Sequence, residues 1–403
     1  MNIIFLTMAN ISGLETHGIY SDLMRKFRDA GHEVYIVSPR ERRTGEDTSV
    51  YDVDGVHFLK VKTLNLQKSN VIEKGIGQVL VESQYKMAIK RYLGDVKFEQ
   101  ILYTTPPITF PKVIEYLKKN NPSSITYLLL KDIFPQNAVD LGMMSKSGVK
   151  SLLYRFFRKK EKKLYSLSDH IGCMSPANVR YVIEHNPEVD PARVEVAPNS
   201  LELSQRNTSD NTDKKTILIR YGIPLDKPVF IYGGNLGSPQ GIPFLIDCLD
   251  ANASRVDCFI VVIGTGTELP KLKSWYNATN PRSVKVMEGL PKLDYDRFVR
   301  CCDVGMIFLD HRFTIPNFPS RLLSYLENKM PVICATDPNT DIGRIAEENG
   351  FGYWCESNSV EAFTLMLDKM IHSNRKEMGE KGFEFLRANY LVENTYNAII
   401  KHV

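Results

Sequence analysis

The chain has 403 residues, of which 43% are hydrophobic and 24% charged, and its formal net charge is +4. These values are typical of a soluble globular protein, and the length favours two α/β domains because a single core rarely serves more than about 250–300 residues. The weak positive charge does not favour nucleic acid as a partner, and no apolar stretch approaches the ~18 residues of a membrane span. The seven cysteines follow neither a disulfide nor a zinc spacing, so we expect buried thiols in a reducing cytosol.

The first residues predict the start of a doubly wound sheet. Residues 3–8 form a short apolar run, typical of a buried parallel strand, and no cationic segment of a signal peptide precedes it. We therefore expect a cytoplasmic protein. A polar loop follows, then apolar residues at helical spacing over 19–30 and a second strand at 34–37. This strand–helix–strand order predicts a right-handed crossover.

Further short strands are predicted in both halves of the chain, with helical stretches such as 112–120 between them. The strands lie at 56–62, 100–103, 126–130, 170–174, 193–196, 229–232, 259–263, 284–287, 304–308 and 332–334. The polar stretch 204–215 has the composition of a linker. We therefore predict an α/β protein with two doubly wound Rossmann-like domains, 1–203 and 216–382, which face a ligand cleft at the carboxyl ends of their strands.

A glycine-rich turn follows the predicted strand at 229–232. The segment 229–241 reads VFIYGGNLGSPQG, and a helix is predicted to begin near Gly241. Such a turn can bring backbone N–H groups and a helix N-terminus to a diphosphate, or it can be a purely structural turn.

A second glycine pair, Gly264-x-Gly266, follows the strand at 259–263. Leu269 stands where a dinucleotide-binding motif has its third glycine, and no acid follows at the expected distance. A nicotinamide site is therefore not predicted, whereas contact of this loop with a phosphate or base stays open.

The triplet Asp52-Val53-Asp54 matches a pattern that holds Mg²⁺ or Mn²⁺ with a sugar nucleotide. Asp54-Gly55 also heads a predicted strand, and this dipeptide is typical of a hairpin turn. We favour the turn over the metal site.

The stretch 146–164 predicts a basic amphipathic helix. Its apolar side chains share one helical face: Val149, Leu152, Leu153, Phe156, Phe157 and Leu164. Its cations cover much of the rest: Lys150, Arg155, Arg158, Lys159, Lys162 and Lys163. Such a helix either contacts the anionic inner surface of a membrane or lies on the protein surface with a solvated cationic face.

Taken in order, these pieces resemble the retaining glycosyltransferase family 4, especially its bacterial polysaccharide branch, over nearly the whole chain. LLLKDIFPQNAVDLGM at 128–143 resembles the branch's Asp-Leu-Trp-Pro stretch, and 168–182 followed by 195–202 resembles its last strand–helix–strand and Pro-Asn hinge. YGGNLGSPQG at 232–241 is similar to the family's Gly-Arg…Lys-Gly loop, and 318–333 to its Pro-Ser-Lys…Pro-Val helix. The resemblance implies the two-domain GT-B fold, with a C-terminal helix at about 383–403 packed on the first domain.

The chain departs from this family at charged positions. Asn235 and Gln240 stand at the loop's Arg and Lys positions, and the family's two glutamates fall at Pro316 and Ser324. Arg321, at the Pro-Ser-Lys lysine, is then the main cationic candidate for a diphosphate, unless it is a surface residue in a salt bridge. We expect the backbone N–H groups of Gly237 and Gly241 to supplement it.

The resemblance assigns further residues to each side of the site. The predicted donor-binding residues are Gly234, Asn235, Leu236, Gly237, Gln240, Gly241, Gly264, Gly289, Leu290, Ser320, Arg321 and Ser324. Gly13, Gly18 and Lys131 are predicted on the acceptor side. His17 and Asp132 are the catalytic candidates: Asp132 to accept a hydrogen bond from the attacking hydroxyl, and His17 to orient a sugar hydroxyl. Alternatively, His17 caps the following helix and Asp132 the following turn.

The predicted function is retaining transfer of a hexosyl or N-acetylhexosaminyl group from a nucleotide-diphosphate sugar, with UDP as the expected nucleotide. The acceptor would be a hydroxyl of a glycan or a polyprenyl-diphosphate-linked intermediate in capsule or O-antigen synthesis. We expect no metal, no cofactor and no nucleic acid partner, and a cytoplasmic protein that can lie on the inner face of the membrane. The alternatives are a GT-B nucleotide-sugar epimerase and a non-catalytic partner in polysaccharide assembly.

Overall fold

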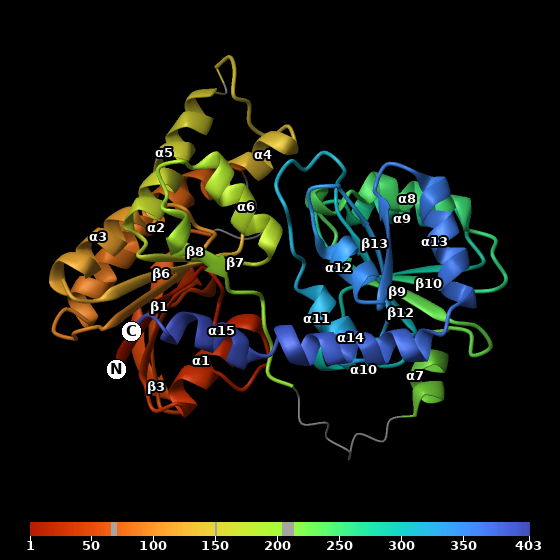
Figure 1. Cartoon of the computed structure of the whole chain (residues 1–403), viewed down its shortest axis with the longest axis horizontal. Coiled ribbons are helices and arrows are strands. Elements are labelled where there is room, and N and C mark those ends of the chain that lie inside the picture. Colours follow the sequence, from red (N-terminus) through yellow and green to blue (C-terminus); the bar gives the residue numbers. More distant parts are fainter. Residues whose placement is uncertain (66–70, 150, 204–212) are drawn as a thin grey trace. The chain divides into compact units, whose positions relative to one another are not determined.

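The computed structural model describes residues 1–65, 71–149, 151–203 and 213–403 and divides into two compact units. Unit one comprises Met1–Glu202 and Leu391–Val403, and unit two comprises Leu203–Tyr390. Each unit contains one sheet with helices packed around it (Figure 1). In the first strand, residues 3–6 are all fully buried, so both faces of the sheet are covered. Two doubly wound halves were predicted, and the prediction is confirmed.

The sheet of unit one has eight strands in the order β3-β4-β2-β1-β5-β6-β7-β8. The strands are β1 (Asn2–Leu6), β2 (Glu33–Glu41), β3 (Ser49–Val53), β4 (Val56–Thr63), β5 (Gln100–Thr104), β6 (Ile125–Leu130), β7 (His170–Cys173) and β8 (Val194–Val196). The pair β3–β4 is antiparallel, and Asp54-Gly55 joins it with φ values of 55° and 73°. Two consecutive positive φ values are typical of a tight hairpin, so the predicted turn is confirmed.

Helices connect these strands. Those of unit one are α1 (Ile19–Asp29), α2 (Val71–Tyr92), α3 (Pro111–Asn120), α4 (Gln136–Asp140), α5 (Ser151–Leu167), α6 (Pro176–His185) and α15 (Val392–Ile400). Short 3₁₀ turns lie at Arg42–Thr44 and Pro191–Arg193. Helices α1 and α15 pack side by side, with the rings of Phe27 and Tyr396 4.9 Å apart.

The predicted C-terminal helix at about 383–403 is two helices. The first, α14 (Arg375–Asn389), belongs to unit two, and only α15 packs on unit one. Between them the chain turns extended at Leu391, which pairs with Leu201 as an isolated parallel bridge. The ring of Tyr390 packs against Phe318 and Phe385, which holds the end of α14 in unit two.

The sheet of unit two is six-stranded and parallel, in the order β11-β10-β9-β12-β13-β14. Its strands are β9 (Val229–Asn235), β10 (Phe259–Thr265), β11 (Val284–Glu288), β12 (Val304–Phe308), β13 (Val332–Thr336) and β14 (Gly352–Glu356). Its other helices are α7 (Lys214–Arg220), α8 (Ile242–Ala251), α9 (Leu269–Thr279), α10 (Lys292–Val299), α11 (Arg321–Glu327), α12 (Ile342–Glu348) and α13 (Val360–His372). Of the predicted linker 204–215, residues 204–212 lie outside the described part, and Asp213 already caps α7.

Each sheet has one point at which the strand order reverses. In unit one it lies between β1 and β5, and in unit two between β9 and β12. In open α/β sheets, ligands bind in the crevice at the carboxyl ends of the strands beside such a point. A ligand site is therefore expected at the loops after β1, β9 and β12.

All seven cysteines are buried and unpaired, as predicted. None of the described helices combines the length and the apolar character needed to cross a bilayer.

Candidate functional site

A buried cation lies at the carboxyl end of β9. Arg321 is the first residue of α11, and its guanidinium carbon lies 4.3 Å from the centroid of the Tyr232 ring. Its Nη1 atom is buried without a hydrogen-bond partner, and no carboxylate of the described residues forms an ion pair with it. A Cβ at Gly234 would lie 3.6 Å from its Nη2 atom. Because a buried charge is costly unless it is paired, this guanidinium is suited to an anionic ligand.

Tyrosines surround this cation. The Tyr232 hydroxyl donates to the Asn235 carbonyl at 2.8 Å, and the Tyr325 hydroxyl accepts the Gly233 N–H at 3.1 Å. A Cβ at Gly233 would lie 1.9 Å from the Tyr295 hydroxyl, so only glycine leaves room for that ring. Burial raises the pKa of Tyr295 to about 12 although the Arg321 charge opposes this, so the hydroxyl stays protonated.

The loop after β9 hydrogen-bonds to itself. Asn235 donates its side-chain amide to Gln240 Oε1 at 3.0 Å, and the Gly237 N–H donates to the same oxygen at 3.2 Å. The Gly241 N–H donates to the Ser238 carbonyl, because Ser238–Gln240 form a 3₁₀ turn. The N–H groups of Gly237 and Gly241, which were predicted to supplement Arg321, are thus both bonded within the loop in this structure. Leu236 is fully buried in the core.

Gly241 brings the loops after β9 and β12 together. It has a φ of 59°, and a Cβ there would lie 3.2 Å from the Asp310 Cα. The Asp310 N–H donates to the Pro239 carbonyl at 3.0 Å, and its carboxylate accepts two bonds from the Arg312 guanidinium. Burial by itself would raise the pKa of Asp310, but the bonds from Arg312 outweigh it and lower the pKa.

The other donor-side residues occupy the neighbouring strand ends. A Cβ at Gly264 would lie 1.9 Å from the Gly234 carbonyl oxygen, so Gly264 lets β10 approach the end of β9. Gly289 and Leu290 follow β11, two strands from β9. Ser320 precedes Arg321 and is exposed, and Ser324 lies one turn further along α11. The structure thus brings Gly234, Gly264 and Arg321 together, and Gly289 packs against the end of β10, since a Cβ there would lie 2.9 Å from a Thr265 methyl carbon and 3.8 Å from the Gly264 carbonyl carbon.

In unit one, a pocket of about 550 Å³ opens beside the loop after β1. It is lined by Asn10, Ile11, Ser12, Gly13, Glu15, Thr16, His17, Ser21, Val53 and Asp54. Gly13 needs no special conformation, since a Cβ there would meet open space, and Gly18 is extended at φ 178°. The fully buried end of Lys60 fixes this loop: its Nζ atom donates to Asn10 Oδ1 at 2.6 Å and to the Ile11 carbonyl at 2.8 Å.

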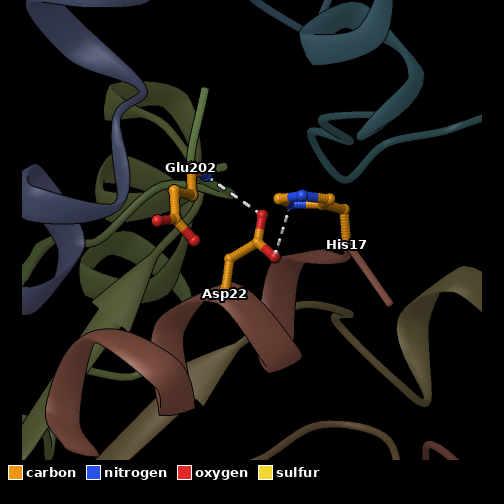
Figure 2. Close-up of side chains that lie close together, drawn as sticks. All are labelled: His17, Asp22 and Glu202. Carbon is orange, nitrogen blue, oxygen red and sulfur yellow. Dashed lines mark hydrogen bonds and ion pairs between the residues drawn. The ribbon is translucent and has the colours of Figure 1, made fainter. Parts of the chain in front are cut away.

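His17 is held by a buried carboxylate. Its Nδ1 atom lies 3.3 Å from Asp22 Oδ1, and the Glu202 N–H donates to Asp22 Oδ2 at 3.0 Å (Figure 2). Asp22 also accepts the Gly18 N–H at the start of α1, so His17 does not cap this helix and that alternative is wrong.

The side chains of His17, Asp22 and Glu202 lie close enough together to hold a metal ion. However, the Arg25 guanidinium contacts both carboxylates and the Leu14 carbonyl. Because this cation already compensates the two acids, the cluster is suited to positioning the His17 loop rather than to binding a metal.

Asp132 and Lys131 follow β6, two strands from β1, and they do not line the pocket of His17. Asn137 of α4 donates to both Asp132 oxygens, at 2.7 and 2.9 Å, and the backbone N–H of Ile133 also bonds to this carboxylate. Burial raises the pKa of Asp132 to about 6, although the Asn137 bonds lower it. Burial lowers the pKa of Lys131 to about 7, and its Nζ atom donates to the Ala197 carbonyl at 3.1 Å.

The predicted basic helix forms as α5, but its predicted apolar face is divided. Phe157 and Leu164 are buried in unit one, whereas four large apolar side chains on the N-terminal side are exposed: Val149, Leu152, Leu153 and Phe156. Lys150 lies outside the described residues. The sequence pattern could not show this division, because it depends on where α3 packs against α5 and where Phe134 meets Phe157.

Comparisons with known proteins agree with this architecture. Residues 213–385 match the family described as Glycosyl transferases group 1. The chain is 22% identical over 331 residues to the probable glycosyltransferase WbjE of Pseudomonas aeruginosa, covering 80% of this chain and 78% of that protein.

Solved structures show the same fold. Sucrose-phosphate synthase from Thermosynechococcus elongatus superposes with a TM-score of 0.77 at 13% identity, covering 100% of this chain and 98% of that one. HepE of Anabaena, solved in complex with UDP, superposes with a TM-score of 0.68 at 12% identity, covering 100% of this chain and 99% of that one. The chain therefore has the fold of GT-B glycosyltransferases, and residues 213–385, within its second unit, are similar to the glycosyl transferases group 1 family.

Proposed function

We propose that this chain, whose residues 213–385 form a glycosyl transferases group 1 domain, moves a sugar from a nucleotide-diphosphate sugar to a hydroxyl group. The observation that carries the proposal is the buried, unpaired guanidinium of Arg321 at the end of β9. When the anomeric bond breaks, negative charge grows on the leaving diphosphate. A cation already fixed at that place stabilises this charge without reorganising.

UDP is the proposed nucleotide. HepE, which has the same fold, was solved with UDP, and this supports a uridine nucleotide here. A hexosyl or N-acetylhexosaminyl group and retention of anomeric configuration follow from the resemblance to family 4.

The proposed reaction needs neither a metal nor a cofactor. Arg321 takes the place of a divalent ion at the diphosphate, and the Tyr232 ring keeps its guanidinium in position. The Asp-x-Asp triplet, which could hold a metal in other sugar-nucleotide enzymes, is here the turn of the β3–β4 hairpin. This lends support to a metal-independent reaction.

Asp132 and His17 are the proposed acceptor-side groups. With a pKa near 6, Asp132 is largely ionised at neutral pH and can accept the proton of an attacking hydroxyl. Asp22 holds the Nδ1 side of the His17 ring and leaves Nε2 to orient a sugar hydroxyl. We propose an acceptor hydroxyl on a glycan or polyprenyl-diphosphate-linked intermediate of bacterial capsule or O-antigen synthesis, at the cytoplasmic face of the membrane.

The experiment is a thermal-unfolding series with UDP, GDP, dTDP and CMP in a chelator. We expect one nucleoside diphosphate, UDP, to raise Tm. Arg321→Ala should lose this shift, whereas Arg344→Ala, which removes an exposed arginine of α12, should keep it. No shift with any nucleotide would refute the donor site and leave the non-catalytic partner as the better reading.

A second measurement separates transfer from epimerisation. UDP release from UDP-glucose and UDP-N-acetylglucosamine is followed with and without a lipid-linked acceptor fraction. Transfer requires the acceptor, whereas conversion of the donor sugar in its absence would identify an epimerase.

A further inference from the structure

A second pocket of unit one lies among helices α2, α3 and α5 and takes no part in the proposed reaction. Its volume is about 570 Å³. It is lined by Glu82, Ser83, Lys86, Thr109, Lys112, Phe156 and Lys160. Three lysines against one carboxylate give it an excess of positive charge.

Glu82 is buried and already engaged. Its Oε1 atom accepts the Lys112 N–H at 2.7 Å, and its Oε2 atom accepts Lys160 Nζ at 3.0 Å. The ammonium groups of Lys86 and Lys112 have no carboxylate partner among the described residues; Lys86 Nζ lies over the Tyr116 ring at 5.8 Å. Two cations of the pocket are therefore available to an anion.

Thr109 provides an independent sign of a ligand. This residue is 3% exposed and lines the pocket, and its hydroxyl has no hydrogen-bond partner. Buried hydroxyls are almost always paired. An acceptor oxygen of a bound group would satisfy it, and a phosphate oxygen beside the lysines would do so while also neutralising their charge.

An exposed apolar surface adjoins the pocket. Phe156 lines the pocket and is partly exposed, and the preceding turns of α5 expose Leu152 by 67% and Leu153 by 50%. Val149, just before the helix, is 88% exposed. Soluble proteins rarely leave such a group of large apolar side chains open to water without a partner.

The two ends of α5 differ in charge pairing as well. Towards its C-terminus, Lys162 pairs with Glu188 and Lys163 pairs with Glu115. On the N-terminal side, Arg155 and Lys159 are exposed, and neither forms an ion pair with a carboxylate of the described residues. Unpaired cations beside exposed apolar groups are typical of a surface that meets anionic lipid.

We propose that this pocket binds the phosphate headgroup of an anionic membrane lipid, while the exposed apolar side chains at 149–156 enter the acyl boundary of the bilayer. The proposal deepens the membrane location of the proposed function and rests on it. It commits to a lipid rather than a soluble phosphate because the apolar side chains directly border the cationic pocket.

The experiment is flotation of the full chain with vesicles of phosphatidylcholine alone or with about one third phosphatidylglycerol. We expect binding to the anionic vesicles only, falling as salt is added. Lys86→Ala/Lys112→Ala should weaken binding roughly 30-fold, since each cation near an anionic surface contributes about fivefold. The matched control is Lys90→Ala/Lys119→Ala, which removes two exposed lysines from the same helices and should cost far less.

Two further variants test the hydroxyl and the apolar surface. Thr109→Val should lower the affinity for anionic vesicles several-fold. Leu152→Ser/Leu153→Ser should reduce binding at least tenfold, whereas Val256→Ser/Leu365→Ser, at exposed apolar positions of unit two, should not. The Tm of each variant shows that it is folded.

The outcomes that would overturn the proposal are distinct. If both double lysine variants lose vesicle binding equally, the attraction comes from diffuse surface charge rather than from a binding site. Stabilisation by inorganic phosphate that depends on Lys86 and Lys112, without vesicle binding, would identify a soluble ligand instead. Arg321→Ala should bind vesicles like the wild type, so failure of membrane binding and failure of the donor site can be told apart.

Discussion

The guanidinium of Arg321 stacks on the ring of Tyr232, with 4.3 Å between the guanidinium carbon and the ring centroid. The two residues are far apart in sequence and meet because α11 begins beside the end of β9. The Tyr232 hydroxyl is bonded to the Asn235 carbonyl, so the ring is fixed at its far end. Among the described residues, Arg321 is the only cation stacked on this strand end, and its position therefore depends on one aromatic ring.

This relationship predicts a difference between two substitutions at Tyr232. Tyr232→Phe keeps the ring and should change the Kd for UDP by less than about threefold. Tyr232→Leu removes a contact of about 0.5–2 kcal/mol and should raise the Kd by roughly two- to thirtyfold. Titration calorimetry measures both. Equal affinity of the two variants would show that the ring does not position Arg321.

Two glycines of the predicted site should respond differently to alanine. Gly241 has a left-handed φ of 59° and little space before the Asp310 backbone, whereas a Cβ at Gly13 meets open space. A left-handed alanine costs about 1–2 kcal/mol. Gly241→Ala should therefore lower Tm by several degrees, and Gly13→Ala should leave it unchanged. A wild-type Tm for Gly241→Ala would mean that the two loops can separate at no cost.

Activity should depend on the ionisation of Asp132. Because the pKa of this carboxyl is raised to about 6 in the folded protein, its protonated form is favoured by folding. Its contribution to stability is thus complete at pH values below about 4 and is lost as the pH rises through 6. Catalysis needs the ionised form, so kcat/KM should fall as the pH drops below about 6, and Asp132→Asn should remove most activity at all pH values.

The same carboxyl offers a test of positioning. The hydrogen bonds from Asn137 lower the pKa of Asp132, so Asn137→Ala should move the acid limb of the pH profile to higher pH. Gln136→Ala removes a neighbouring amide of α4 that bonds to Asp140 instead, and it should leave the limb in place. If the acid limb of the pH profile is unchanged in Asn137→Ala, the hydrogen bonds between Asn137 and Asp132 do not influence the ionisation on which activity depends.

Local patterns predicted most of the fold. Every predicted strand is present, and its ends lie within a few residues of the predicted ones, because short apolar runs between turn residues specify buried parallel strands. The exposed edge strand β3 was not predicted, since its alternating polar residues carry a weak signal, and neither were α2 and β14. The break between α14 and α15 depends on the pairing of Leu391 with Leu201, a contact between distant segments that no local pattern contains.

The site was less predictable than the fold. Arg321 was found through its spacing in the family that the chain resembles. Its guanidinium is buried beside Tyr232, which favours the predicted contact with a phosphate over the alternative of a surface salt bridge. Tyr295 and Tyr325 were missed because they reach the end of β9 from separate helices. The Gly237 N–H was assigned to a ligand although Gln240, three residues on, accepts it. Loop hydrogen bonds of this kind depend on side-chain geometry that spacing does not specify.

The carboxylate of Asp22 joins three segments of unit one. It accepts bonds from the N–H of Gly18 and of Glu202, and it lies 3.3 Å from Nδ1 of His17. Asp22→Asn replaces one acceptor oxygen by a donor that must face another donor. A buried group left without its partner costs about 1–3 kcal/mol, so Tm should fall by several degrees.

The same variant should also release the His17 ring. Because Asp22 then no longer holds Nδ1, the KM for the acceptor should rise several-fold while the Kd for UDP stays that of the wild type. Asp29→Asn, on the exposed side of the same helix, removes a carboxylate that pairs with its neighbour Arg28 and should change neither value. If Asp22→Asn lowers Tm but leaves the acceptor KM unchanged, the carboxylate stabilises the loop without positioning His17 for substrate, and His17 loses its proposed role.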